Sequence, residues 1–229
     1  MLSRRAIAEE LMDADDLPEA TYTAVMRDLA RVNTVTRARA PTLAFLGRVA
    51  RRCPGPLRIL DVGFGDGDML RAIHRWAKRV RVEVTLVGVD LNPRSLAAAR
   101  ASTPTDMRIE FRIGDYAALA DEHWDVIVSS LVAHHMTDEQ LVAFLCFMNA
   151  DARRGWFVND LHRHGFAWLG YPLLARLAGW HPIVRHDGRL SIARSYRPDE
   201  WPPILNEAGV TGARVFRAFP FRLCVEKLR

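Results

Sequence analysis

The sequence predicts an α/β fold: a doubly wound, Rossmann-like sheet that is mostly parallel and has helices on both faces. Two observations predict this fold. Short apolar runs alternate with segments of helical periodicity between residues 57 and 159, and such alternation is typical of a parallel sheet. Acidic residues, glycines or histidines follow these apolar runs. Doubly wound folds bind ligands at the carboxyl ends of their strands, so we expect the functional residues there.

The first part of the chain, residues 1–55, is expected to be helical. Apolar residues recur at three- and four-residue spacing between Leu11 and Val32 and again between Leu43 and Val49, as on one face of a helix. A Pro-Gly-Pro sequence at residues 54–56 then interrupts the pattern, because both residue types favour turns. We therefore predict an N-terminal helical extension, or substrate-side lid, over residues 1–55 and a main domain over residues 56–229.

The main domain is predicted to begin as alternating strands and helices and to end with an insertion and a hairpin. The expected strands are 57–62, 82–90, 107–113, 124–129 and 155–159, and the expected helices are 67–78, 94–101 and 138–149. A substrate-side insertion is expected at 160–197, with an apolar helix at 166–180 and an irregular stretch at 185–189. Next we expect a helix that begins at Pro198 and two β-rich runs, 211–216 and 221–227.

The most informative segment is a short apolar strand that ends in Asp61 and is followed by Gly63, Gly65 and Gly67 before a helix. Glycines let the backbone turn sharply and approach a ligand closely, and the helix N-terminus offers free N–H donors. A dinucleotide fingerprint would require a further glycine where this chain has Asp68. Clustered carboxylates would repel a pyrophosphate, so the loop favours a ligand that carries ammonium and sulfonium groups. The alternative is that the segment is an ordinary tight turn that binds no ligand.

Two further strands end in acidic residues. Asp90 and Leu91 follow a β-branched run, about 20 residues beyond the glycines, where doubly wound folds place an acid on ribose hydroxyls. Asp90 could instead cap the helix that begins near Pro93. Asp115 and Tyr116 follow the next strand, and a simple turn or helix cap is the alternative there.

The fourth apolar run contains Ser129 and leads into adjacent histidines, His134 and His135. In this order, the four segments resemble the motifs of class I methyltransferases that depend on S-adenosylmethionine (SAM). The resemblance implies a seven-stranded sheet with an antiparallel last strand, SAM as cofactor and S-adenosylhomocysteine (SAH) as product. It also implies a methionine site at the glycine loop, a ribose site at Asp90 and an adenine site at Asp115. The residues expected to bind the cofactor are Asp61, Gly63, Gly65, Gly67, Asp68, Asp90, Leu91, Asp115, Tyr116 and Ser129.

The outer segments resemble bacterial small-molecule methyltransferases of polyketide, phenol and quinone biosynthesis. This resemblance implies a small aromatic, polyketide-like or quinone-like acceptor that is methylated on oxygen. Carbon methylation, methylation of RNA or protein, and a non-catalytic SAM-binding protein remain as alternatives. An oxygen nucleophile needs a base or a stabilising cation, and histidine titrates near neutral pH.

The candidate bases are, first, His134 or His135 and, second, Asp160 with His162, which could form a carboxylate–imidazole pair. The alternative is that the first two support the loop or stack near the adenosine. For the second pair, the alternative is a turn with a helix cap before Phe166. Both segments follow strands at the end of the sheet where the other motifs collect.

Composition narrows the remaining possibilities. The net charge is +5 and the pI is about 9.5, which raises the possibility of nucleic-acid substrates. However, 27 acidic residues face 32 basic ones, and the arginines are scattered in pairs, so we expect no nucleic-acid partner. Three distant cysteines predict neither a disulfide nor a metal site and suit a reducing cytoplasm.

From the sequence we expect neither a signal peptide nor a transmembrane segment. Its apolar segment at 166–180 could form core, a substrate wall, a membrane contact or a homodimer surface.

Overall fold

The computed structural model describes residues 2–14 and 16–229. Its strands are β1 (Leu57–Val62), β2 (Val84–Asp90), β3 (Ile109–Ile113), β4 (Val126–Ser130), β5 (Gly155–Leu161), β6 (Arg214–Ala218) and β7 (Arg222–Leu228). They form one seven-stranded sheet in the order β3-β2-β1-β4-β5-β7-β6. The first five strands are parallel, and β7 runs antiparallel to both of its neighbours. The predicted fold, including the antiparallel last strand, is confirmed.

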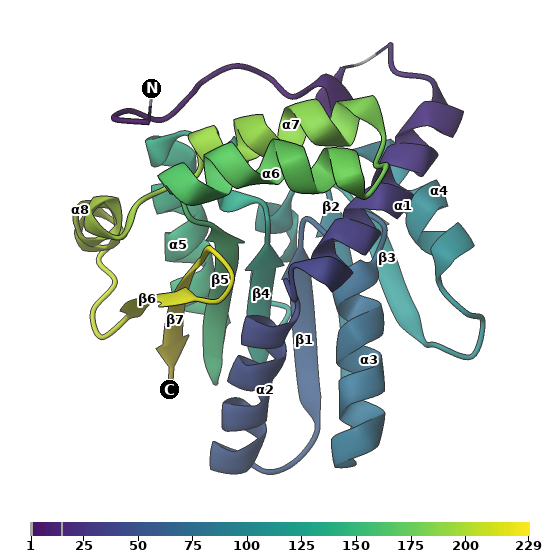
Figure 1. Cartoon of the computed structure of the whole chain (residues 1–229). Helices are drawn as coiled ribbons and strands as arrows, with labels where there is room; N and C mark the ends of the chain where they lie inside the picture. The colour runs from purple at the N-terminus through teal and green to yellow at the C-terminus, as the bar shows by residue number, and fades with distance from the viewer. Residues whose placement is uncertain (1, 15) are drawn as a thin grey trace.

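Helices cover both faces of this sheet and its upper edge (Figure 1). The α-helices are α1 (Glu19–Val35), α2 (Ala40–Arg52), α3 (Asp68–Val80), α4 (Pro93–Ser102), α5 (Asp138–Asp151), α6 (Gly165–Leu177), α7 (Pro182–Arg194) and α8 (Trp201–Glu207). Short 3-10 helices are η1 (Leu11–Asp13), η2 (Tyr116–Leu119), η3 (Ala133–His135) and η4 (Pro198–Glu200). In Figure 1, α6 and α7 lie across the carboxyl ends of β4 and β5.

The irregular stretch expected at residues 185–189 is wrong, because these residues belong to α7. Gly188 lies within this stretch, and its role is close packing between helices. A Cβ atom at this position would lie 2.2 Å from the ring of Tyr171 in α6. Gly188 therefore lets α6 and α7 approach each other closely inside a continuous helix.

The N-terminal extension divides between two parts of the molecule. Helix α2 packs on the sheet, where Phe45 stacks on Phe157 of β5 with ring centroids 5.0 Å apart. It contributes to the same buried cluster as α3, while α5 and α8 pack on the opposite face. In contrast, η1 and α1 pack against α7. The domain boundary at residue 55 remains a prediction. Within residues 1–55, η1 and α1 lie where a lid was expected, whereas α2 belongs to the sheet layer.

Helix α6 presents an apolar face to the outside. Phe166, Leu169, Leu173 and Leu177 are each more than 60% exposed and follow one stripe of the helix. A subunit contact on this stripe remains a prediction. Among residues 2–14 and 16–229, none of the helices has the length and apolar content that crossing a bilayer requires.

Candidate active site

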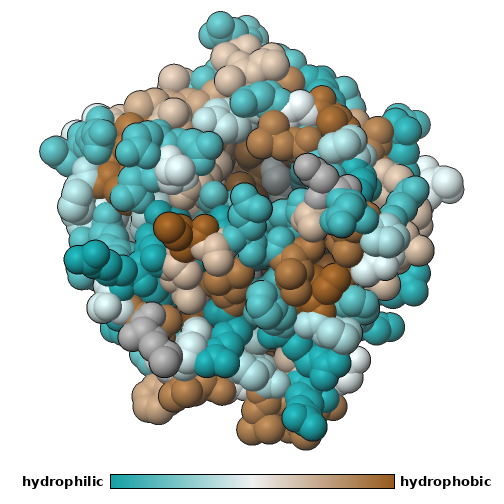
Figure 2. Space-filling model, turned by 90° about the horizontal axis from the view of Figure 1, so that it is seen from above, coloured by the Kyte–Doolittle hydropathy of each residue, from teal (hydrophilic) through white to brown (hydrophobic). Residues whose placement is uncertain are grey.

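A cavity of about 590 Å³ lies at the carboxyl ends of β1, β2 and β4. The glycine loop after β1 lines one end, and η3 and α7 line the other. Residues of η1, α1 and α6 supply the remaining walls. Seen from above in Figure 2, apolar side chains gather around a hollow in this face of the molecule. The cavity therefore lies where the sequence predicts the functional residues.

The glycine loop turns with three residues in the left-handed region. Gly63, Gly65 and Gly67 have φ angles of 79°, 55° and 78°, which side chains with a Cβ rarely adopt. At Gly63 there is also no space, because a Cβ atom would lie 2.2 Å from the Val132 side chain. The loop can therefore bring its backbone close to a ligand in the cavity.

Asp90 joins the glycine loop to the end of β2. Its carboxylate accepts hydrogen bonds from the backbone N–H groups of Gly65, at 2.8 Å, and Asn92, at 2.9 Å. The N-cap of α4 is Asn92, whose side chain accepts from the Arg94 N–H. The capping role that was the alternative for Asp90 thus belongs to Asn92. Asp90 also lines the cavity.

Asp61 is a buried carboxylate that lines the cavity, and neither of its oxygens has a hydrogen-bond partner among the described residues. Burial, together with the charges of Asp90 and Asp68, raises the pKa of Asp61 to about 8. Asp68 differs, because it forms an ion pair of 2.6 Å with Arg39. Asp61 is therefore a carboxyl group without a hydrogen-bond partner among the described residues, and a cationic group that enters the cavity would favour its ionised form.

The other expected cofactor residues occupy varied positions. Leu91 and Tyr116 line the cavity. Asp115 is exposed and caps η2 by accepting the N–H of Ala117 at 2.8 Å. Ser129 is buried and donates its hydroxyl proton to the carbonyl of Val62. The structure therefore gives Asp115 and Ser129 structural contacts, and their contact with a cofactor remains a prediction.

At the opposite end of the cavity, His134 lies buried between two carboxylates. Its Nδ1 is 2.7 Å from the Asp160 Oδ1, and its backbone N–H donates to the other oxygen of the same carboxylate at 2.8 Å. Its Nε2 is 3.6 Å from the Glu10 Oε1. The hydroxyl of Ser191 donates to this Glu10 oxygen at 2.7 Å. The N-terminal segment thus supplies a functional-site residue for which the sequence analysis predicted no role.

These carboxylates change the protonation of the cluster. Burial acts to lower the pKa of His134, but the charge and hydrogen bond of Asp160, with Glu10, raise it to about 9. Burial acts to raise the pKa of Glu10, but His134 and His135 lower it to about 2. Without a ligand, His134 is therefore an imidazolium at neutral pH.

The second histidine, His135, is partly exposed and lines the same cavity. Its Nε2 is 3.9 Å from the Glu10 Oε1, and its Nδ1 is 3.5 Å from the Asp13 Oδ2. Both histidines of the sequence motif therefore face the N-terminal segment. Their grouping with Glu10 joins positions more than 100 residues apart, which no sequence spacing could indicate.

The pairing of Asp160 with His162 is wrong, because Asp160 binds His134 instead. The His162 residue lies beyond the end of β5 and turns towards the hairpin between β6 and β7. Its N–H donates to the Phe221 carbonyl, and its ring lies 5.2 Å from that of His164. Burial and nearby positive groups lower the pKa of His162 to about 4. Neither Asp160 nor His162 lines the cavity.

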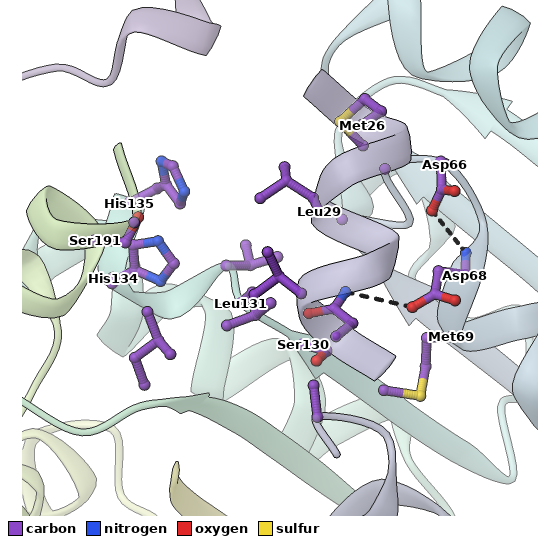
Figure 3. Close-up of a pocket in the computed structure, with 18 of the residues that line it drawn as sticks. Met26, Leu29, Asp66, Asp68, Met69, Ser130, Leu131, His134, His135 and Ser191 are labelled. Atoms are coloured by element: carbon purple, nitrogen blue, oxygen red, sulfur yellow. Dashed lines mark hydrogen bonds between the residues drawn. The ribbon is translucent and has the colours of Figure 1, made fainter. Parts of the chain in front are cut away.

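The cavity has two chemically different ends. Figure 3 shows His134 and His135 on one side and the carboxylates of Asp66 and Asp68 on the other. Leu29 of α1 lies between them. An apolar passage therefore separates an acidic loop from a histidine pair.

Comparison with known proteins identifies the family of the sheet region. The family model described as a methyltransferase domain matches residues 59–153. This range begins in β1 and ends just before β5, so it contains the glycine loop, Asp90 and the histidine pair. No curated protein matches the chain by sequence.

Solved structures share the fold at low sequence identity. A plantazolicin methyltransferase, in complex with SAH and a desmethyl-plantazolicin analogue, is 14% identical with a TM-score of 0.66. The match covers 90% of this chain and 89% of that chain. Magnesium protoporphyrin IX methyltransferase from Synechocystis PCC 6803, with bound SAH, is 18% identical with a TM-score of 0.57 and coverages of 95% and 90%. Human N-acetylserotonin methyltransferase, in complex with SAM, is 16% identical with a TM-score of 0.63 and coverages of 93% and 56%.

Proposed function

The chain is a class I SAM-dependent methyltransferase, and from this premise we propose that it methylates an oxygen atom of a small aromatic or polyketide-like acceptor. One observation carries the proposal: a single cavity joins the acidic glycine loop to the histidine pair, His134 and His135, through apolar walls. Its volume of about 590 Å³ lies within the roughly 300–1,000 Å³ typical of small-molecule sites.

The residues at the loop end fit SAM. The methionine part of SAM carries an ammonium group, and Asp61 is the cavity carboxylate that lacks a partner among the described residues. The carboxylate of Asp90 lies at the end of β2, where ribose hydroxyls are bound in doubly wound folds. When bound, SAM supplies an already activated methyl group. The solved neighbours named above, two with SAH and one with SAM, support this assignment.

The walls at the histidine end suit a small apolar acceptor. They include Met12 of η1, Leu29 of α1, Phe166 and Leu174 of α6, and Phe221 before β7. These elements cover part of the cavity from above, so they would shield an acceptor from water. Exclusion of water and orientation of the nucleophile are the main requirements of methyl transfer from SAM.

His134 and Asp160 can assist an oxygen nucleophile. A phenol has a pKa near 10, so it reacts better when a nearby cation stabilises its phenolate. The imidazolium of His134 lines the cavity and can act in this way. Asp160 is a positioning residue, because it holds the imidazole by Nδ1 and leaves Nε2 towards the cavity side.

Incubation with methyl-labelled SAM and separate pools of small metabolites, total RNA and protein tests the proposal. We expect label in a small aromatic or polyketide-like product, with the new methyl group on oxygen by NMR. Label confined to RNA or protein contradicts the small acceptor. A new carbon–methyl bond contradicts the oxygen assignment, and SAM binding without transfer to any pool contradicts catalysis.

A further inference from the structure

We propose that Glu10, His134 and His135 form a binding site for a divalent transition-metal ion of the zinc type. The site lies at the acceptor end of the cavity. Its place beside the acceptor rests on the proposed function, whereas the binding of the ion does not. The proposal is carried by the ligand set, the groups behind the ligands and the local charge.

The three side chains have the chemistry and spacing of a metal site. Their potential ligand atoms all lie within 4.8 Å of one another. The Glu10 Oε1 lies between the two rings, 3.6 Å from the His134 Nε2 and 3.9 Å from the His135 Nε2. Imidazole nitrogens with one carboxylate oxygen suit Zn²⁺ and its transition-metal neighbours. Three protein ligands also leave a coordination position open, as in catalytic zinc sites.

Each ligand has a second polar group behind it, and for His134 and Glu10 this group is hydrogen-bonded to the ligand. Asp160 binds the Nδ1 of His134 at 2.7 Å, and Asp13 lies 3.5 Å from the Nδ1 of His135. Metal-binding histidines almost always hold such a carboxylate or carbonyl on the other ring nitrogen. The hydroxyl of Ser191 donates to Glu10. Both Nε2 atoms are thereby left for an ion.

The charge around the cluster favours a cation. Three carboxylates, from Glu10, Asp13 and Asp160, surround two imidazoles. In the part of the chain that the structure describes, their only ion-pair partners are these histidines. The nearby Arg5 and Arg194 bind backbone carbonyls of η3 and its C-cap instead. A divalent ion would offset this negative charge.

The ion would specify the acceptor class. An open coordination position that faces the cavity suits a phenolic or enolic hydroxyl, and a neighbouring carbonyl or hydroxyl would strengthen the contact. Coordination lowers the pKa of such a hydroxyl, so its proton leaves to water. The oxygen then forms the bond to the methyl carbon as the sulfur–methyl bond of SAM breaks, and SAH and the methyl ether are the products.

Cobalt(II) titration of the full chain, made without a histidine tag and stripped by a chelator, tests the site. We expect one ion per chain by elemental analysis and an intense visible band of four- or five-coordinate Co²⁺, which Zn²⁺ abolishes. His135→Ala should remove the band. Asp13→Asn should weaken Co²⁺ binding by about 10–100-fold, the usual effect of losing a group behind a ligand. His164→Ala, a partly buried histidine outside the cluster, is the matched control and should bind as the wild type does.

SAH binding, measured on the same samples, separates this proposal from the proposed function. A wild-type chain that binds SAH but leaves Co²⁺ with the spectrum of the hydrated ion overturns the metal site alone. Equal Co²⁺ binding by His135→Ala and His164→Ala overturns it as well. A cobalt band that appears in a chain unable to bind SAH or SAM supports the metal site and contradicts the proposed function instead.

Discussion

Individual carboxylates around the cavity differ in their hydrogen-bond partners, and this difference determines their roles. Asp90 accepts two backbone N–H groups, so it shapes the glycine loop in addition to any contact with ribose. Asp115 is exposed and caps η2. Asp61 lacks a hydrogen-bond partner in the described part of the chain. Substitution of each residue should therefore have a different effect on cofactor binding.

Asp90→Ala should weaken SAM binding by about 1–3 kcal/mol, because it removes a charged acceptor and releases the Gly65 N–H. Calorimetry measures this loss. Asp115→Ala tests the predicted adenine contact separately. Weaker SAM binding would support this contact, and unchanged SAM binding would contradict it. Unchanged affinity in both Asp90→Ala and Gly65→Val would remove the basis for a cofactor site at this loop.

His134→Ala should lower turnover by roughly 10²–10³-fold, the usual cost of removing one group that stabilises an oxyanion. SAM affinity should stay nearly intact, because the histidine lies at the other end of the cavity (Figure 3); retained affinity also shows that the variant folds. His162→Ala is the control and should cost less than about tenfold, since this residue lies outside the cavity lining. Equal losses in both variants would contradict the assignment.

At the scale of elements, the N-terminal segment closes the cavity by binding to α7 and η3. The buried carboxylate of Asp187 in α7 accepts the N–H groups of Leu11, at 3.0 Å, and Met12, at 2.9 Å. The guanidinium of Arg5 lies 3.7 Å from the ring centroid of Tyr196 and donates to the Met136 carbonyl. These contacts are polar, and the apolar side chains of Ile7 and Leu11 remain exposed, so the segment should open locally more easily than the sheet.

Asp187→Ala should therefore increase opening of the N-terminal segment. It removes two charge-assisted hydrogen bonds, each worth about 1.5–3 kcal/mol, and about 1.4 kcal/mol is already tenfold in an equilibrium. Limited proteolysis near residue 10 should become at least about tenfold faster, while global unfolding changes less. Asp199→Ala, at an exposed position of η4, is the control. Equal cleavage rates in the two variants would show that Asp187 does not hold the segment.

The sequence predicts elements that are formed by neighbouring residues better than features that depend on residues distant in the chain. The β1 strand and the glycine loop depend on neighbouring residues, so local pattern predicts them. Helix α7 was not predicted. A glycine inside a helix is locally unfavourable, and the reason for Gly188, the close approach of Tyr171, lies in another helix. A role for Glu10 was not predicted for the same reason, since its partner His134 is distant in the chain. The partner of Asp160 was misassigned because nothing local favours His134 over His162.

At the scale of the whole molecule, the sign of the net charge does not predict the charge of the cavity. The chain carries a formal charge of +5, yet the cavity is lined by acidic residues at both ends. They are Glu10, Asp13, Asp61, Asp66, Asp68 and Asp90. Only two arginines, Arg39 and Arg222, are among the described residues that line the cavity, so a protein with a positive net charge can have a cavity that attracts a cationic cofactor. The free energy of unfolding should therefore depend on pH through the buried acidic groups.

Asp61 should make the ligand-free chain less stable as pH rises. Its pKa is about 8 in the folded chain, against an ordinary value of 3.8, so the folded state holds a proton that the unfolded state releases between these values. Stability therefore falls as pH rises from about 4 to about 8. The pKa of His134, raised from 6.5 to about 9, adds a loss above pH 6.5. The difference between the wild type and Asp61→Asn isolates the Asp61 effect.

SAM binding should reverse this effect by releasing a proton. The SAM ammonium would stabilise the Asp61 carboxylate and lower its pKa, so up to one proton per chain should leave on binding near pH 7. Calorimetry in buffers of different ionisation enthalpy counts that proton. The Asp61→Asn variant should release less and bind more weakly, and its melting temperature should vary less between pH 5 and 8. Equal proton release by the variant and the wild type would show that another group meets the ammonium.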